Sequence, residues 1–247
     1  MQTFTTTFLV FLSAHLLTAF VLPTHRGRKP AKLTAHFGHG LAHYLTACAL
    51  AGLVAVSWLA SWPFQAAALG LTVTDLLILT VESRIERDGG LVSFVSSELL
   101  HLLAAGGAAW IIARPGTGTL AAGLETFRHD PNRPLALLVV YLAVVFGGGA
   151  VVRVASRSLL VSMHTAKPVE AELKNAGLYI GWLERFLILT ALLLQSPSTA
   201  GLILTAKSVV RYPEMNKSLA FAEYFLIGTL LSISIAVAGG LILRSAW

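Results

Sequence analysis

The sequence predicts an all-α fold, a polytopic membrane bundle of about eight transmembrane helices. Of 247 residues, 55% are hydrophobic and 12% are charged, whereas an average soluble domain has roughly 25% charged residues. The mean hydropathy is +0.74, and the apolar residues form runs close to the length of about 20 residues that crosses a bilayer. This number of charged residues is too small for the water-exposed surface of a soluble protein of this size. The excess apolar surface must therefore face lipid.

Eight apolar segments follow one another along the chain. Each is interpreted as a helix, because a continuous helix satisfies its own backbone hydrogen bonds in lipid. The seventh has about 16 residues and reaches only ~24 Å, so it is expected to be tilted, bilayer-thinning or re-entrant. The segments are 3–22, 33–59, 64–81, 91–113, 134–152, 177–194, 197–212 and 219–243.

The basic residues predict the orientation. The first segment has no positive charge before it and is followed by four, so it is interpreted as a retained anchor and not as a signal peptide. Most of the 18 Lys and Arg residues lie on that same side, which the positive-inside rule places in the cytoplasm. We expect an inner-membrane protein with both termini outside the cytoplasm. Basic helix ends also account for the net charge of +6, so no nucleic-acid partner is expected.

Two polar connections divide the chain. The extracytoplasmic linker 114–133, with a short helical stretch around 120–127, separates a four-helix unit at 1–113 from another at 134–247. The cytoplasmic connection 156–176 is interpreted as containing a short surface helix. The single cysteine, Cys48, excludes an intrachain disulfide and a Cys-based metal site.

Six ionisable residues of the first four helices share one depth, about 9 to 15 Å from the cytoplasmic ends at 1.5 Å per residue. A titratable group at membrane depth costs at least ~2.5 kcal/mol and is a functional-site hypothesis that needs a partner. His39 and His43 are four residues apart, and Glu98 and His101 are three apart, so each pair lies on one helix face. The six residues are His15, His39, His43, Asp75, Glu98 and His101.

Imidazole and carboxylate ligands favour one divalent metal, namely zinc, manganese or iron, over a thiolate-seeking ion. A bound ion could activate water and polarise a carbonyl or phosphoryl oxygen, with Asp75 or Glu98 as a ligand or general base. Two alternatives stay open. The layer could carry proton chemistry, or its members could be interhelical hydrogen-bond partners without any chemistry.

A second layer is predicted in the carboxyl half, where opposite charges have similar depths. Such residues form a buried ion-pair network that fixes helix packing, or they line an ion pathway. Glycines at 106–107 and 147–149 are interpreted as close-packing or kink sites. The residues of the layer are Glu184, Arg185, Lys207, Arg211 and Glu223.

Several motifs resemble the bacterial membrane family called domain of unknown function 3307. They are His15-Leu-Leu-Thr-Ala19-Phe20-Val21-Leu22, His39-Gly-Leu-Ala-His43, Ser97-Glu98-Leu-Leu-His101, Ile180-Gly181-Trp-Leu183-Glu184-Arg185, Ala206-Lys207-Ser208, Arg211-Tyr-Pro-Glu214 and Ala222-Glu223-Tyr224-Phe225-Leu-Ile-Gly228-Thr229.

Members of this family look like His-x-x-x-Asp in the first and third helices, a pattern similar to that of membrane-bound metal-dependent hydrolases. Here Ala19 stands at the position of the first Asp, and Leu71 stands four residues before Asp75, at that of the second His. The resemblance therefore implies a site with donors for one ion and two family-like ligands missing. The charges of the carboxyl half match the family pattern.

Three functions follow from these patterns. The first is a metal-dependent hydrolase of a lipid-borne or membrane-peptide substrate, in degenerate form. The second is an oligomeric ion channel or transport protein that uses the layer of Glu184, Lys207 and Glu223. The third is a structural or accessory subunit of a larger membrane complex, which needs no chemistry.

Overall fold

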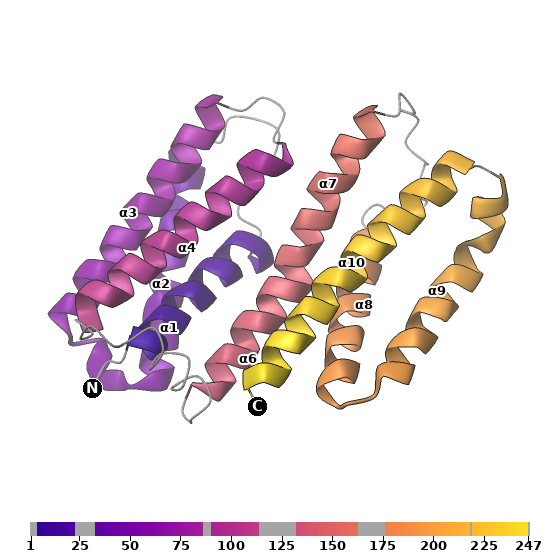
Figure 1. The fold of residues 1–247 in the computed structure, drawn as a ribbon. Helices are drawn as coiled ribbons and strands as arrows, with labels where there is room; N and C mark the ends of the chain where they lie inside the picture. Colours follow the sequence, from indigo (N-terminus) through magenta and orange to yellow (C-terminus); the bar gives the residue numbers. More distant parts are fainter. Residues whose placement is uncertain are drawn as a thin grey trace. The chain divides into compact units, whose positions relative to one another are not determined.

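The computed structural model describes residues 4–22, 33–85, 90–113, 132–162, 176–217 and 219–246, which form helices and short turns with no strand among them (Figure 1). The predicted all-α fold is confirmed. Within these residues, 6 helical stretches are long and apolar enough to cross a membrane, so the chain is a multi-pass membrane protein. The count of about eight spans stays a prediction. The short helix predicted around 120–127 lies outside the described residues. Of the connection 156–176, residues 156–162 are helical, and residues 163–175 lie outside the described residues, so the surface helix there stays a prediction.

The chain forms two compact units, Met1–Leu142 (unit 1) and Ala143–Trp247 (unit 2). Their boundary lies inside the fifth apolar stretch, because the first part of that stretch packs on the amino-terminal helices. The sequence placed the division earlier, at 114–133.

Unit 1 is a four-helix bundle with one added helix. Its elements are α1 (Phe4–Leu16), the π-helical turn η1 (Leu17–Val21), α2 (Leu33–Val54), the 3-10 turn η2 (Val56–Trp58), α3 (Trp62–Ile85), α4 (Leu91–Ala113) and α6 (Arg133–Tyr141). Contacts join α1 to α2, α2 to α3, α3 to α4 and α4 to α1, which closes the bundle. Helix α6 packs on α1, and the hydroxyl of Thr6 donates to Asn132 Oδ1 over 2.7 Å just before α6 begins.

Every helix of the bundle contributes to the apolar core of unit 1, with Phe11, Ala47, Leu71 and Ala105 among the core residues. The Phe11 ring stacks on Phe64 at a centroid distance of 5.3 Å. Each of the four core residues lies four positions from one of His15, His43, Asp75 and His101, and residues four apart share a helix face. The ionisable layer therefore faces the same bundle interior, one helical turn from the core.

The outer surface of unit 1 is apolar, as a lipid-facing surface must be. Leu53 on α2, Val92 on α4 and Ile111 on α4 are exposed by 84%, 83% and 71%. The bundle thus has apolar side chains outside and a polar layer inside, the arrangement expected where ionisable residues face the interior of a membrane bundle.

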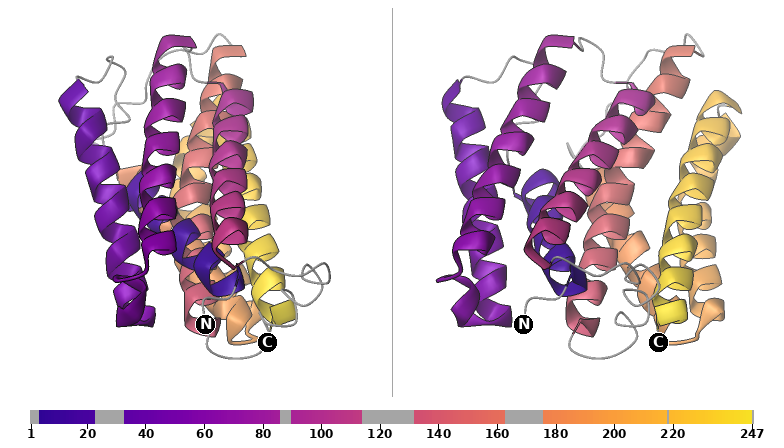
Figure 2. Two further views of the ribbon diagram at one scale, coloured as in Figure 1. Left: turned by 90° about the vertical axis from the view of Figure 1, so that its left-hand side faces the viewer. Right: turned by 60° about the vertical axis from the view of Figure 1, so that its left-hand side comes forward.

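Unit 2 is organised around one long helix. Its helices are α7 (Gly148–Ser162), α8 (Ala176–Leu193), α9 (Pro197–Lys217) and α10 (Leu219–Ala246), preceded by the π-helical segment η3 (Leu142–Gly147) that spans the boundary. Helix α10 contacts α7, α8 and α9, and α8 contacts α7 and α9 (Figure 2).

Helices α8 and α9 form a tight hairpin. Gln195 has a left-handed backbone with φ 57°, and the Ser196 amide donates to the Ala191 carbonyl while that of Gln195 donates to Leu192, the Schellman pattern that ends a helix. Helix α9 has 21 residues, none of them buried. It is longer than the segment predicted, and neither α8 nor α9 is among the 6 candidate spans.

Candidate metal centre

All four helices of the unit 1 bundle contribute to one polar cluster. His15 comes from α1, His39 and His43 from α2, Asp75 from α3, and Glu98 and His101 from α4. Five of these six residues contact another member through a side-chain nitrogen and oxygen. The structure therefore brings together residues that the sequence could only place at one depth.

Asp75 lies at the centre of the cluster. Its Oδ2 is 2.7 Å from His39 Nε2, and its Oδ1 is 2.7 Å from His101 Nε2. The same Oδ1 is 3.8 Å from His15 Nδ1. The residue is only 2% exposed, so one buried carboxylate faces histidines from three neighbouring helices.

Two of these short contacts lack hydrogen-bond geometry. His101 Nε2 and Asp75 Oδ2 are buried polar atoms without a hydrogen-bond partner, although each has a close polar neighbour. His15 Nδ1 is a third such atom. Buried polar atoms are normally hydrogen-bonded, so a group of three at one place requires an explanation, such as a bound cation.

The tautomer of His101 follows from its second nitrogen. His101 Nδ1 is 2.8 Å from the Ser97 carbonyl oxygen, which can only accept, so Nδ1 carries the proton. In the neutral ring the lone pair of Nε2 then points at the Asp75 carboxylate, where two acceptors face each other. Either Nε2 is protonated and donates to Asp75, or both atoms bind the same metal cation, and a ring held by its other N–H is the usual form of a metal-ligating histidine.

His15 and Glu98 extend the cluster on the other side. His15 Nε2 is 3.0 Å from Glu98 Oε2, and the His15 ring stacks on His101 at a centroid distance of 4.3 Å. One ligand atom each from His15, Glu98 and His101 lie within 4.8 Å of one another. Side-chain rotation can bring such atoms to the distance of about 2.0–2.2 Å that zinc requires.

A small cavity of about 10 Å³ lies inside the cluster. That is close to the smallest volume that holds one water molecule, so it fits a single small ion. His43 belongs to the wall of this cavity, and its Nδ1 is 3.4 Å from the Thr72 hydroxyl. The lining residues are Phe11, His15, His43, Leu71, Thr74, Asp75, His101, Ala104 and Ala105.

The backbone adjusts next to His15. The π-helical turn η1 begins two residues later, and π-helical turns often occur at functional sites. The Thr18 hydroxyl lies 2.9 Å from the Ala14 carbonyl and 3.1 Å from that of His15, and it donates to this pair. Thr18 thus satisfies carbonyl oxygens where the helical hydrogen-bond pattern changes.

The charges of the carboxyl half divide between two places. Lys207 Nζ donates to Glu184 Oε2 over 2.6 Å and lies 5.4 Å from the centre of the Phe225 ring. Arg185 points elsewhere, to the Val145 carbonyl and the Ser232 hydroxyl. Adjacent helix residues are about 100° apart around the axis, so Glu184 and Arg185 meet different neighbours.

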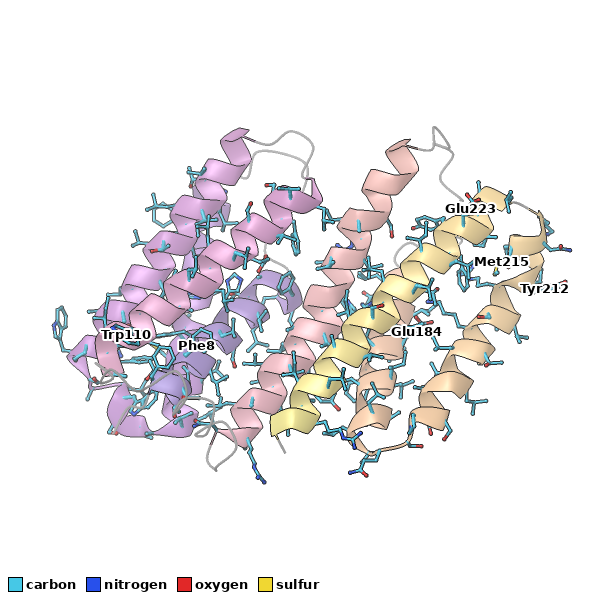
Figure 3. The ribbon with its side chains drawn as sticks, viewed as in Figure 1. Phe8, Trp110, Glu184, Tyr212, Met215 and Glu223 are labelled. Carbon is cyan, nitrogen blue, oxygen red and sulfur yellow. The ribbon has the colours of Figure 1, made fainter. Side chains whose placement is uncertain are left out.

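Arg211 and Glu223 do not join the Glu184–Lys207 pair. Arg211 is half-buried and Glu223 is exposed, and no ion pair is recorded for either with a described residue. Glu223 lies in the first turns of α10, where Figure 3 labels it. It precedes the buried Ser232 by nine residues, which places it about 180° around the helix from the face that meets Arg185.

Residues outside the predicted layers also contribute. Ser97 orients His101, Thr18 supports the turn after His15, and the Val145 carbonyl accepts from Arg185. The bond of His101 goes to the backbone carbonyl of Ser97, which any residue type would provide, so the sequence contains no specific signal for it. The partners of Arg185 are 40 and 47 positions away and give no local signal.

A scan of protein-family models, a search of curated proteins and a search of solved structures each found no match to this chain. The chemistry of the side chains is therefore the ground for a functional inference.

Proposed function

We propose that unit 1 binds one divalent metal ion inside the membrane, with His15, Glu98 and His101 as ligands and Asp75 as a further ligand or orienting carboxylate. The observation that carries the proposal is the convergence of one ligand atom each from His15, Glu98 and His101 within 4.8 Å of one another, beside the buried carboxylate of Asp75. A cation bound there would take the lone pair of His101 Nε2, since Nδ1 of that ring carries the proton. The same cation supplies a partner for the buried His15 Nδ1 or Asp75 Oδ2.

The donor set favours zinc, followed by manganese or iron. Imidazole nitrogens and carboxylate oxygens suit these ions, whereas Cu(I) prefers thiolate or thioether ligands. Two His and one Glu leave one position of a tetrahedral zinc site open. Asp75 can fill that position, or it can hold His39 and His101 as an outer carboxylate.

The chemistry that this site supports best is hydrolysis, in agreement with the family resemblance, which we retain as a proposal. When bound, a divalent ion acts as a Lewis acid toward a carbonyl or phosphoryl oxygen. Glu98 is the most accessible ionisable member that contacts His15, with a side chain 22% exposed against 7% for His15. Its carboxylate can accept a proton from water on the accessible side of the cluster.

The direct test is the metal content of the full chain purified in detergent without chelator. We expect about one equivalent of a divalent metal by elemental analysis and a loss of most of it in His15→Ala and His101→Ala. His36→Ala is the matched control, because it removes an imidazole from α2 that contacts no member of the cluster.

The proposal fails if the wild-type protein, after incubation with zinc, manganese or iron(II) and removal of free ion, retains no stoichiometric metal. It also fails if the cluster variants retain as much metal as His36→Ala. Circular dichroism of each variant shows whether the helical fold persists, and the metal content of the wild type decides the proposal if a variant does not fold.

A further inference from the structure

We propose that Trp62 and Trp110 bind the headgroup boundary of the bilayer and anchor unit 1 there, so that its polar cluster lies near the bilayer midplane. The partner surface is the layer of ester carbonyls and headgroups of a phospholipid membrane. The inference does not require a bound ion, so its test is independent of the metal content. It rests on the position of two exposed indole rings, on the length of the helices beyond them and on the level of the cluster.

The two tryptophans lie at one end of the unit 1 bundle. Trp62 is the first residue of α3, and Trp110 lies in the last turn of α4. Helices α3 and α4 follow each other after a short connection and pack together, so they are antiparallel and these two ends coincide. The Phe4 ring, at the start of α1, meets the Trp110 ring edge to face at 6.1 Å between centroids.

Both indole rings are open to the surroundings of the bundle. Trp62 is 78% exposed and Trp110 is 48% exposed, and no hydrogen bond is recorded for either N–H within the described part of the chain. Farther along the same helices the exposed side chains are apolar, among them Leu69, Leu77 and Leu103. An indole has an apolar body and one polar N–H, and such rings on a membrane protein are enriched where hydrocarbon meets headgroups.

The helices beyond these rings have the length of the hydrocarbon core. The apolar stretch Trp62–Val81 of α3 has 20 residues and directly precedes the charged residue Glu82. On α4, the stretch 91–110 is equally long. At 1.5 Å per residue each reaches ~30 Å, which is the thickness of the hydrocarbon core of a typical bilayer. With the indoles at one boundary, the other ends of both helices therefore meet the opposite boundary.

The polar cluster lies between these two levels. Asp75 follows Trp62 by 13 residues, and His101 precedes Trp110 by nine. These separations correspond to ~20 Å and ~14 Å along the two helices, and half of the hydrocarbon core is about 15 Å. The cluster is thus about as far from one headgroup layer as from the other.

The experiment follows tryptophan fluorescence of the full chain in phosphatidylcholine vesicles. The acyl chains carry bromine either close to the ester carbonyl or close to the terminal methyl group, and bromine quenches an indole at its own depth. The emission of Trp62 and Trp110 is the difference between the wild type and the double variant Trp62→Phe with Trp110→Phe. We expect shallow bromine to quench this emission about twofold more strongly than deep bromine.

A second measurement tests the level of the cluster. Leu99→Trp, introduced into the double variant, places an indole next to Glu98 on the outer surface, because Leu99 is exposed. We expect the opposite order for its emission, with stronger quenching by deep bromine. Trp182→Phe is the matched control. Its ring packs on Phe146 and Tyr179, so its removal should not reduce the emission that shallow bromine quenches.

The proposal is overturned if deep bromine quenches Trp62 and Trp110 as strongly as shallow bromine does. It is also overturned if neither lipid quenches them, which would mean that water or another protein chain surrounds the rings. Quenching of the Leu99→Trp indole mainly by shallow bromine would contradict the midplane position of the cluster. The single variants Trp62→Phe and Trp110→Phe report each ring separately if the double variant does not fold.

Discussion

Each unit of this membrane protein contains a polar cluster, and the two clusters differ in whether their buried polar atoms are hydrogen-bonded. In unit 1, His39 and His101 each lie 2.7 Å from the Asp75 carboxylate, and three buried polar atoms of the cluster have no hydrogen-bond partner. In unit 2, Glu184 and Lys207 form one direct pair at 2.6 Å with hydrogen-bond geometry. A satisfied pair is typical of a group that holds helices together, whereas convergence of unsatisfied atoms is typical of a site for something else.

The two clusters also differ in the side chains that form them: mainly histidines in unit 1, and a carboxylate with an ammonium group in unit 2. The histidines of unit 1 can be neutral at physiological pH, so they can stay buried when a partner is removed. Lys207 and Glu184 must both be charged to form their pair, and a buried charge that loses its partner is costly. The two clusters should therefore respond differently to the removal of one member.

The largest expected effect is that of Lys207→Met. It leaves Glu184 buried without its partner, so we expect a loss of about 3–5 kcal/mol in the free energy of unfolding. The double variant Glu184→Gln with Lys207→Met should recover most of this loss. Unfolding in detergent, followed by circular dichroism at rising denaturant, measures both. A single variant as stable as the wild type would show that the pair does not fix the packing of α8 on α9.

Asp75→Asn should have a smaller effect on stability and a larger one on metal content. The introduced amide can donate to His101 Nε2, and the histidines can be neutral, so we expect a change within about 1–2 kcal/mol. Bound metal should fall well below one equivalent, because the carboxylate charge is lost. If Asp75→Asn instead destabilises the chain as much as Lys207→Met, the unit 1 cluster is a structural network like that of unit 2.

The sequence predicted those properties of the clusters that follow from position along a single helix. It did not predict those that depend on how the helices pack together. Depth follows from counting residues along a helix, and the spacings His39 to His43 and Glu98 to His101 indicate a shared face. The same rule, applied to the consecutive residues Glu184 and Arg185, indicates that they face different neighbours. Depth alone places all five residues in one layer, and within the described part of the chain Glu184–Lys207 is the one ion pair recorded between them.

Other features depend on how helices rotate and pack against each other. The packing of the first part of the fifth apolar stretch on α1, through Thr6 and Asn132, requires contacts across 126 positions. The close approach of the Arg185 and Trp182 side chains to Gly149 is likewise a product of tertiary packing. The π-helical segments η1, which follows His15, and η3, whose Val145 carbonyl accepts from Arg185, have no hydropathy signature, because they leave the apolar run unchanged.

The smallest expected effect tests whether the turn after His15 belongs to the site. Thr18→Val removes the hydroxyl that the Ala14 and His15 carbonyls share, at a cost of about 1 kcal/mol in the free energy of unfolding. Thr46→Val is the control, because the Thr46 hydroxyl donates to the Ala42 carbonyl within a regular helix, where that carbonyl already has a backbone donor. We expect almost no change there. If Thr18→Val also lowers metal affinity while Thr46→Val does not, the π-helical turn positions His15 for the ion. If the two substitutions change the free energy of unfolding and the metal affinity equally, the Thr18 hydroxyl has no special role at the metal site. It would then act like the Thr46 hydroxyl, as a local bond to a helix carbonyl.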